Sequence, residues 1–132
     1  MRPHEKLDVY VMAHELAVRI HRMSMRLPKF ELYEEGAQIR RSSKSVSSQI
    51  VEGHALRTYK ADYVRYLWRA YGSAEETGEH LGLLIETDSA CDVREETASL
   101  VASNDDLCRR LYNYVGAVER QHDSSRPDAG SS

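Results

Sequence analysis

Proline is almost absent from the interior of this chain, and this absence limits the folds that the chain can adopt. The three prolines are Pro3, Pro28 and Pro127. Because a proline removes a backbone donor and clashes with the preceding turn, it ends or kinks a helix, and long helices are allowed between positions 29 and 126. No segment shows the sustained alternation of period two that is typical of strands, and no Asn-Gly or Asp-Gly hairpin turn occurs. We therefore expect an all-α fold.

Four segments carry apolar residues at the spacing of three and four that indicates amphipathic helices. They span residues 7–27, 39–50, 59–85 and 93–118. Gly53 is expected to cap the end of the second helix and Thr58 the start of the third, and Asp92 with Glu95 has the spacing of a capping box. Short connections place neighbouring helices antiparallel. The sequence therefore predicts an antiparallel up-down-up-down four-helix bundle.

Length and composition suit one domain, since the 132 residues are 41% hydrophobic and 30% charged. We expect the bundle over residues 1–121 and a disordered tail over 122–132. The N-terminus lacks the apolar region of a secretory signal, and no run is long enough to cross a bilayer, so we expect a cytoplasmic protein with no membrane partner. Cys91 and Cys108 lack CxxC spacing and are expected to be reduced thiols, with a disulfide as the alternative.

Charge is unevenly distributed along the chain. Residues 38–70 hold seven cations against two acids, whereas residues 75–106 hold ten acids against one arginine. The basic segment could bind the phosphates of a nucleic acid, or it could bind the acidic segment of another copy of the chain. The sequence leaves both alternatives open.

The second helix has an unusual outer face. Its predicted core stripe is Ile39, Ser43, Val46 and Ile50, and the opposite line is Arg41, Ser45, Ser48 and Glu52. Five of the seven residues from 42 to 48 are serines, which are mediocre helix formers. Small side chains of this kind let another backbone approach closely, which indicates a contact with a second element or a second subunit.

The third helix shows the same pattern. Its predicted core stripe is Tyr59, Tyr63, Tyr66, Ala70 and Ala74, which points Ala61, Val64, Trp68, Tyr71 and Gly72 outward. An outward tryptophan beside small residues favours an association patch, although a rotated or kinked helix with Trp68 in the core is the alternative. We therefore predict an oligomer interface on the two helices. It consists of Arg41, Ser45, Ser48, Glu52, Ala61, Val64, Trp68 and Gly72.

These two helices also carry the residues of a known family pattern. The chain reads LPKFE at 27–31, QIRRSSKSVSSQIVEG at 38–53 and AYGSAEE at 70–76, and it opens with LDVYVMAHELA at 7–17. In this order the segments resemble the 23S ribosomal RNA intervening-sequence proteins, whose second helix carries a QIRRA-x-x-S-I-x-x-N-I-A-E-G motif. Lys44 and Gln49 depart from that motif. The resemblance covers about residues 7–88.

The resemblance implies a four-helix bundle that assembles with itself, with five subunits as the expected number and a poorly defined biochemical role. A related group of bundle proteins binds nucleic acids as accessory factors of retroelements, which implies structured RNA or DNA as a second partner. The cations that would contact phosphates are Arg40, Arg41, Lys44, Arg57, Lys60, Arg65 and Arg69, with Tyr59 and Trp68 as stacking partners. The alternative is that Arg41, Glu52 and Arg57 form a structural ion-pair network.

Catalytic motifs are incomplete in the sequence. His14-Glu15 begins an HExxH zinc motif, but Val18 occupies the position of the second histidine. Glu76 and His80 have the spacing of an ordinary polar pair one helical turn apart. No GxSxG elbow, Walker loop or GxGxxG fingerprint occurs. We therefore expect a non-enzymatic protein without a cofactor, a metal or a small-molecule substrate.

Overall fold

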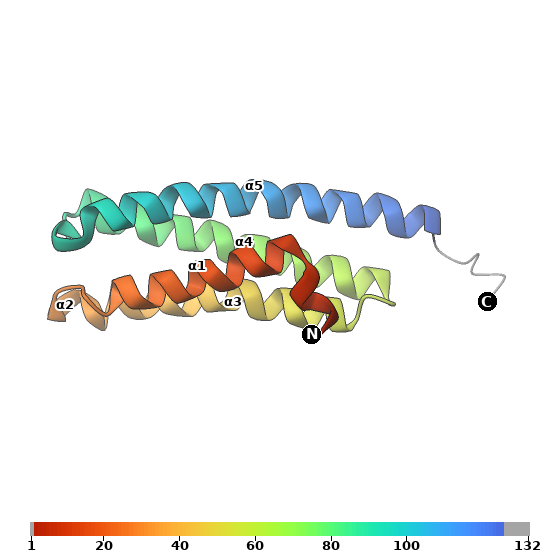
Figure 1. Ribbon diagram of the computed structural model, residues 1–132, viewed down its shortest axis with the longest axis horizontal. Coiled ribbons are helices and arrows are strands. Elements are labelled where there is room, and N and C mark those ends of the chain that lie inside the picture. The colour runs from red at the N-terminus through yellow and green to blue at the C-terminus, as the bar shows by residue number, and fades with distance from the viewer. Residues whose placement is uncertain (1, 126–132) are drawn as a thin grey trace.

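The computed structural model describes residues 2–125, and these residues form an antiparallel bundle of four long helices (Figure 1). The long helices are α1 (Asp8–Ser24), α3 (Glu35–Ala55), α4 (Lys60–Glu86) and α5 (Arg94–Ser125). Three short elements connect or precede them: η1 (Pro3–Lys6), α2 (Lys29–Leu32) and η2 (Cys91–Val93). The described part of the chain contains no strand. The predicted all-α, up-down-up-down architecture is confirmed.

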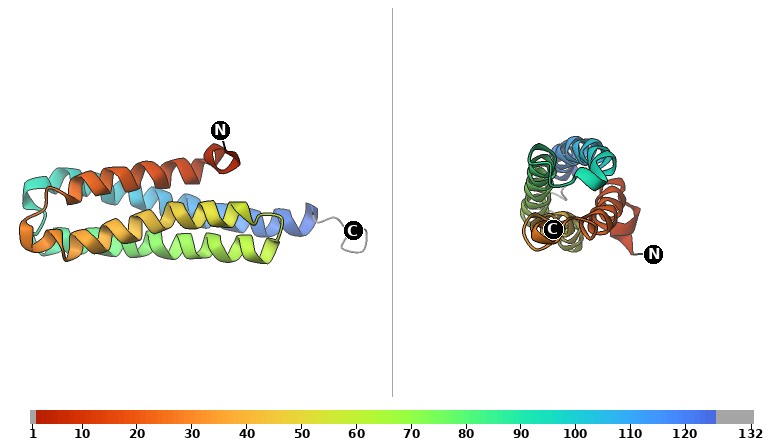
Figure 2. Two further views of the ribbon diagram at one scale, coloured as in Figure 1. Left: turned by 90° about the horizontal axis from the view of Figure 1, so that it is seen from below. Right: turned by 90° about the vertical axis from the view of Figure 1, so that its left-hand side faces the viewer.

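Each long helix packs against two neighbours, so the bundle closes on itself. The contacting pairs are α1 with α3, α3 with α4, α4 with α5, and α5 with α1. Seen from the end, the pair α1–α3 and the pair α4–α5 lie on opposite sides of the bundle (Figure 2). The molecule therefore has two broad outer surfaces that face in opposite directions.

Aliphatic side chains from all four helices fill the centre. The largest fully buried ones are Ile20, Met23, Ile39, Ile50, Leu67, Leu81, Leu84, Leu100, Leu107 and Leu111. Each contributes on the order of 1.5–3 kcal/mol through burial. The predicted core stripe of α3 is confirmed, because Ile39, Ser43, Val46 and Ile50 are all buried.

The predicted core stripe of α4 was partly wrong. Tyr63, Ala70 and Ala74 are buried as expected and Tyr66 is half-buried, but Tyr59 is 63% exposed, and Leu67 is fully buried beside Tyr66. Tyr59 is the residue before the first turn and has an extended backbone, with φ −104° and ψ 98°. A helical projection therefore does not apply to it. Tyr59, not Thr58, is also the N-cap residue of α4.

Gly53 does not cap α3. The helix continues to Ala55, and Gly53 is buried inside it against α4. A Cβ at this position would lie 2.8 Å from the Cβ of Tyr66, which is closer than two carbon atoms can approach. The glycine is needed because the two backbones lie so near each other.

The two ends of the chain carry further details. Asp92 lies within η2 instead of at the residue before α5. Helix α5 extends to Ser125, and the rest of the predicted tail, residues 126–132, lies outside the described residues. Within residues 2–125, no helix combines the length and the apolar character that a membrane crossing requires. Both thiols are free, with Cys91 exposed and Cys108 buried.

Candidate interaction surfaces

Hydroxyl groups join α3 to α4 inside the subunit. The Ser42 hydroxyl lies 2.8 Å from that of Thr77, and the Ser45 hydroxyl lies 3.0 Å from that of Ser73. Small side chains at these positions let the two helices approach closely, which explains much of the serine-rich run. Ser45 is partly buried in this contact and therefore does not belong to an outward line on α3.

The structure divides the predicted oligomer interface into two separate parts. Arg41, Ser48 and Glu52 are exposed on the outside of α3. Trp68 belongs to the other side of α4, because its ring contacts Tyr112 of α5. Ala61 and Gly72 are exposed on α4 as expected, and Val64 is half-buried against a small cluster shared with α5.

Three aromatic rings form a cluster on the outside of α4 and α5. Trp68, Tyr71 and Tyr112 contact one another pairwise, and each pair of ring centroids is 5.6 Å apart. Trp68 is 36% exposed and Tyr112 is 53% exposed, so the cluster covers the surface instead of filling the core. The alternative that places Trp68 in the core is therefore wrong.

An acidic groove of about 380 Å³ continues from this cluster along α4 and α5. It is lined by Glu75, Gly78, Glu79, Asn104, Asp105 and Cys108. Burial, followed by the charges of Glu75 and Asp105, raises the pKa of Cys108 to about 12. The Glu75 carboxylate also raises the pKa of Tyr71. We refer to Trp68, Tyr71, Tyr112, Glu75, Glu79 and Asp105 together as the aromatic–acidic face.

Asn104 in this groove has an incomplete set of hydrogen bonds. Its amide nitrogen donates to the Ala74 carbonyl at 3.0 Å, but its carbonyl oxygen Oδ1 has no partner among the described residues. The side chain is 1% exposed. A buried acceptor without a donor costs about 1–3 kcal/mol, so a missing partner is expected here.

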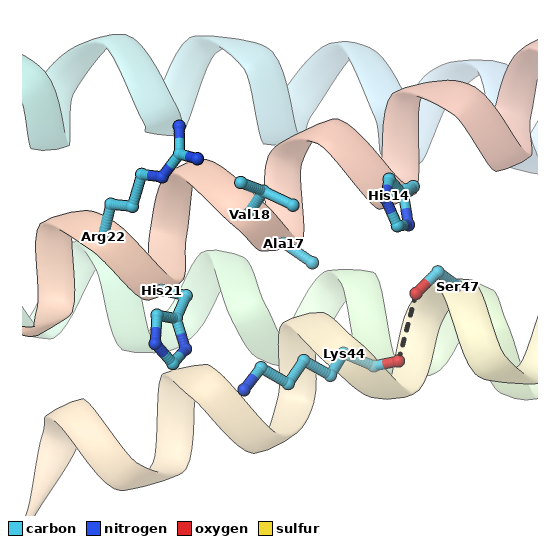
Figure 3. Close-up of a pocket in the computed structure, with 7 residues that line it drawn as sticks. All are labelled: His14, Ala17, Val18, His21, Arg22, Lys44 and Ser47. Atoms are coloured by element: carbon cyan, nitrogen blue, oxygen red, sulfur yellow. Dashed lines mark hydrogen bonds between the residues drawn. The ribbon is translucent and has the colours of Figure 1, made fainter.

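On the opposite side of the bundle, α1 and α3 enclose a second groove of about 430 Å³ (Figure 3). It is lined by His14, Ala17, Val18, His21, Arg22, Lys44 and Ser47, and we refer to it as the basic groove. Lys44 extends from α3 toward His21, whereas Arg22 points away from Lys44 (Figure 3). No carboxylate is among the described residues that line it.

The predicted phosphate-contacting cations differ in their exposure. Arg40 is half-buried and donates to the Ser24 hydroxyl and to the Leu32 carbonyl, both at 2.9 Å, so it fastens the α1–α3 connection. Lys60 is half-buried. The remaining cations are exposed: Arg41, Lys44, Arg57, Arg65 and Arg69.

The arginines of the alternative ion-pair network contact their own helical turns. Arg41 donates to Gln38 at 2.9 Å, and Arg57 donates to the His54 carbonyl at 2.9 Å. Burial, followed by the charge of Arg57, lowers the pKa of His54. The contacts of both arginines are therefore local and do not extend to Glu52.

His80 is the histidine with the most polar contacts. Its ring nitrogens lie 2.7 Å from Glu35 of α3 and 3.3 Å from Glu76, so it links the start of α3 to α4. The expected pair of Glu76 and His80 is confirmed. Among the side chains that the structure describes, which end at residue 121, no three of His, Cys, Asp or Glu lie close enough to hold a metal ion.

These features define a small helical-bundle protein whose notable chemistry lies on its outer surfaces. The chain belongs to the 23S rRNA-intervening sequence protein family, whose model matches residues 5–113. The resemblance found in the QIRRSSKSVSSQIVEG segment is thereby confirmed.

A solved structure supports the same assignment. The chain is similar to a crystal structure of a protein with unknown function from the S23 ribosomal protein family of Bacteroides thetaiotaomicron. The two share 28% sequence identity and a TM-score of 0.68, over 81% of this chain and 97% of that chain. A comparison with curated proteins gave no match.

Proposed function

We propose that this protein is a non-enzymatic assembly module that associates with further copies of itself. The observation that carries the proposal is the cluster of Trp68, Tyr71 and Tyr112, in which Tyr71 is half-buried and the rings of Trp68 and Tyr112 are exposed. Aromatic rings are enriched at the centre of protein interfaces, where they bury a large area at a small cost in side-chain entropy. The family resemblance gives five as the expected number of subunits.

Two glycines on the same face of α4 as Trp68 support the proposal. A Cβ at Gly72 or at Gly82 would meet nothing within 4 Å. Glycine costs about 1 kcal/mol relative to alanine in a helix, and no contact inside the subunit explains that cost. A second subunit lying against α4 would explain it.

Mass measurement tests this proposal. Light scattering on the purified protein at micromolar concentration should give several times the 15.1 kDa of one chain. Trp68→Glu should lower the mass to that of a single chain, because a charge would be buried in the contact. Tyr33→Glu is the matched control, since Tyr33 is 73% exposed and lies outside the cluster, and its mass should not change. A wild-type protein that stays monomeric would refute the proposal.

The single tryptophan gives a second measurement. Trp68 emission should shift to longer wavelength on dilution, because dissociation returns the ring to water. A constant emission maximum across the concentration range in which the mass changes would show that Trp68 lies outside the contact.

A second candidate function is nucleic-acid binding, favoured by one local arrangement on α4. The guanidinium groups of Arg65 and Arg69 lie 5.8 Å and 5.3 Å from the ring centre of Tyr66. Two cations beside an aromatic ring are suited to a phosphate backbone with a stacked base. Binding to structured RNA should weaken steeply with salt and should be lost in Arg65→Glu/Arg69→Glu. Absence of binding at low salt would reject this candidate.

A further inference from the structure

We propose that copies of this chain associate head to tail, with the aromatic–acidic face of one copy seated on the basic groove of the next. This inference rests on the proposed self-association and adds to it the two surfaces that meet. The surfaces lie on opposite sides of the bundle, on α4–α5 and on α1–α3 (Figure 2). Contact between two different surfaces of the same chain is a heterologous contact, which extends from copy to copy and closes into a ring where the rotation permits.

The charges of the two surfaces are complementary. Three carboxylates, those of Glu75, Glu79 and Asp105, line the groove of one surface. Lys44 and Arg22 line the other, together with two imidazoles. Complementary potentials of this kind set the orientation in which two surfaces meet.

These charges also lack an ion-pair partner among the described residues of the subunit. The ion pairs between described residues include Arg26 with Glu96, Arg65 with Asp62, and Arg94 with Asp88. None of the ion pairs in the described part of the chain includes Glu75, Glu79, Asp105, Arg22 or Lys44. The subunit therefore satisfies many of its other charges internally and leaves those of the two surfaces without an ion-pair partner.

Asn104 points to the chemistry of the missing partner. Its Oδ1 is a buried acceptor without a donor among the described residues, and its side chain lines the acidic groove. The group that would complete the groove must donate hydrogen bonds and carry positive charge. A lysine ammonium, with three N–H donors on a flexible stem, meets both requirements, and Lys44 of the next copy is exposed on α3.

The apolar parts of the two surfaces also match. The basic groove has apolar walls at Ala17 and Val18, and Val18 is 36% exposed. Trp68 and Tyr112 project from the opposite side of the molecule. Burying these groups against one another supplies the attraction, and the flanking charges fix the orientation.

Two complementary variants test the inference. Lys44→Glu removes the basic groove and leaves the aromatic–acidic face intact, whereas Glu75→Lys/Glu79→Lys does the reverse. All three residues are exposed, so the variants should fold, which circular dichroism checks. Each variant alone should have the mass of one chain, 15.1 kDa. An equimolar mixture should regain an assembly larger than one chain, because the intact groove meets the intact face, and the groove of Lys44→Glu meets the face of Glu75→Lys/Glu79→Lys with both charges reversed.

The outcomes separate this inference from the proposed function. A wild-type assembly together with a mixture that stays at the mass of one chain would overturn the head-to-tail contact and leave self-association standing. A monomeric wild type would overturn both. Arg41→Glu is the matched control, since Arg41 is an exposed cation on α3 outside the groove lining, and its mass should equal that of the wild type. Dissociation of Arg41→Glu, with Lys44→Glu unaffected, would also overturn the inference.

Discussion

The two sides of α4 differ in how many of their side chains find a contact or a hydrogen bond within the subunit. Toward α3, serine and threonine hydroxyls pair with one another, and Gly53 lets the backbones meet. Toward α5, the same helix leaves exposed aromatic rings and lines a groove that contains the unpaired Oδ1 of Asn104. The many serines facing the α3 side would have suggested a binding surface there, yet the hydroxyls on that side already pair within the subunit. Incomplete contacts, more than hydrophobicity, indicate where a partner binds.

The largest expected effect on the free energy of unfolding is on the side of α4 that faces α3. Gly53→Ala should lower the free energy of unfolding by up to about 3 kcal/mol, because the new Cβ meets a Cβ of Tyr66 that cannot rotate away. Gly72→Ala is the control, since its Cβ would enter open space within one subunit, and in the monomeric Trp68→Glu background it should stabilise the fold by up to about 1 kcal/mol. Urea unfolding measures both. If both variants changed the free energy of unfolding by the same amount, the two sides of α4 would not differ in how closely they are packed.

A smaller effect is expected from the hydroxyl pair between α3 and α4. Thr77→Val should cost about 1–2 kcal/mol, because the buried Ser42 hydroxyl loses its 2.8 Å hydrogen bond and keeps only the 3.4 Å bond to the Ile39 carbonyl. The double variant Ser42→Ala/Thr77→Val should cost less than the sum of the single variants, since neither group is then left unpaired. Additive losses in urea unfolding would show that the two hydroxyls do not depend on each other.

Helix periodicity was enough to predict the fold, because burial of an apolar stripe every three or four residues determines which helices exist. It was less reliable for the role of each side chain. The sequence could not show that Trp68 lies on the α5 side of α4. Its partner, Tyr112, is 44 positions further along the chain, and no local pattern links the two residues. Arg40 appeared to be a surface cation, but it fastens the α1–α3 connection through Ser24 and Leu32.

Asn104 was missed for the same reason. It follows the helical period of the fourth segment, and the period shows only that it is buried. Whether its amide has enough partners depends on Gly78 and Ala74 of α4, which come close only in the folded bundle. A signal was present in the recurrence of Trp68, Gly72, Glu75, Glu79 and Gly82 at alternating steps of four and three, which places them on one face of α4.

Replacing Asn104 should separate folding from assembly. Asn104→Leu should change the free energy of unfolding of the monomer by less than about 1 kcal/mol, because the lost bond to Ala74 is offset by removal of an unpaired acceptor. The same variant should weaken self-association measured by light scattering, since the groove loses an acceptor for a cation. Unchanged association would place the partner of Asn104 inside the subunit.

The smallest effect at neutral pH concerns Cys108, whose pKa rises from an ordinary value of 9.0 to about 12. Its burial and the carboxylates beside it favour the neutral thiol in the folded state, so this contribution to stability is complete below pH 9. The contribution should decline as the pH rises from 9 toward 12, because the unfolded chain then loses a proton that the folded chain retains. The melting temperature should therefore fall less steeply over this range in Cys108→Ala than in the wild type. Identical slopes would mean that the thiol is not held neutral by the acidic groove, and the contrast between the two sides of α4 would then depend on Asn104 and the aromatic cluster alone.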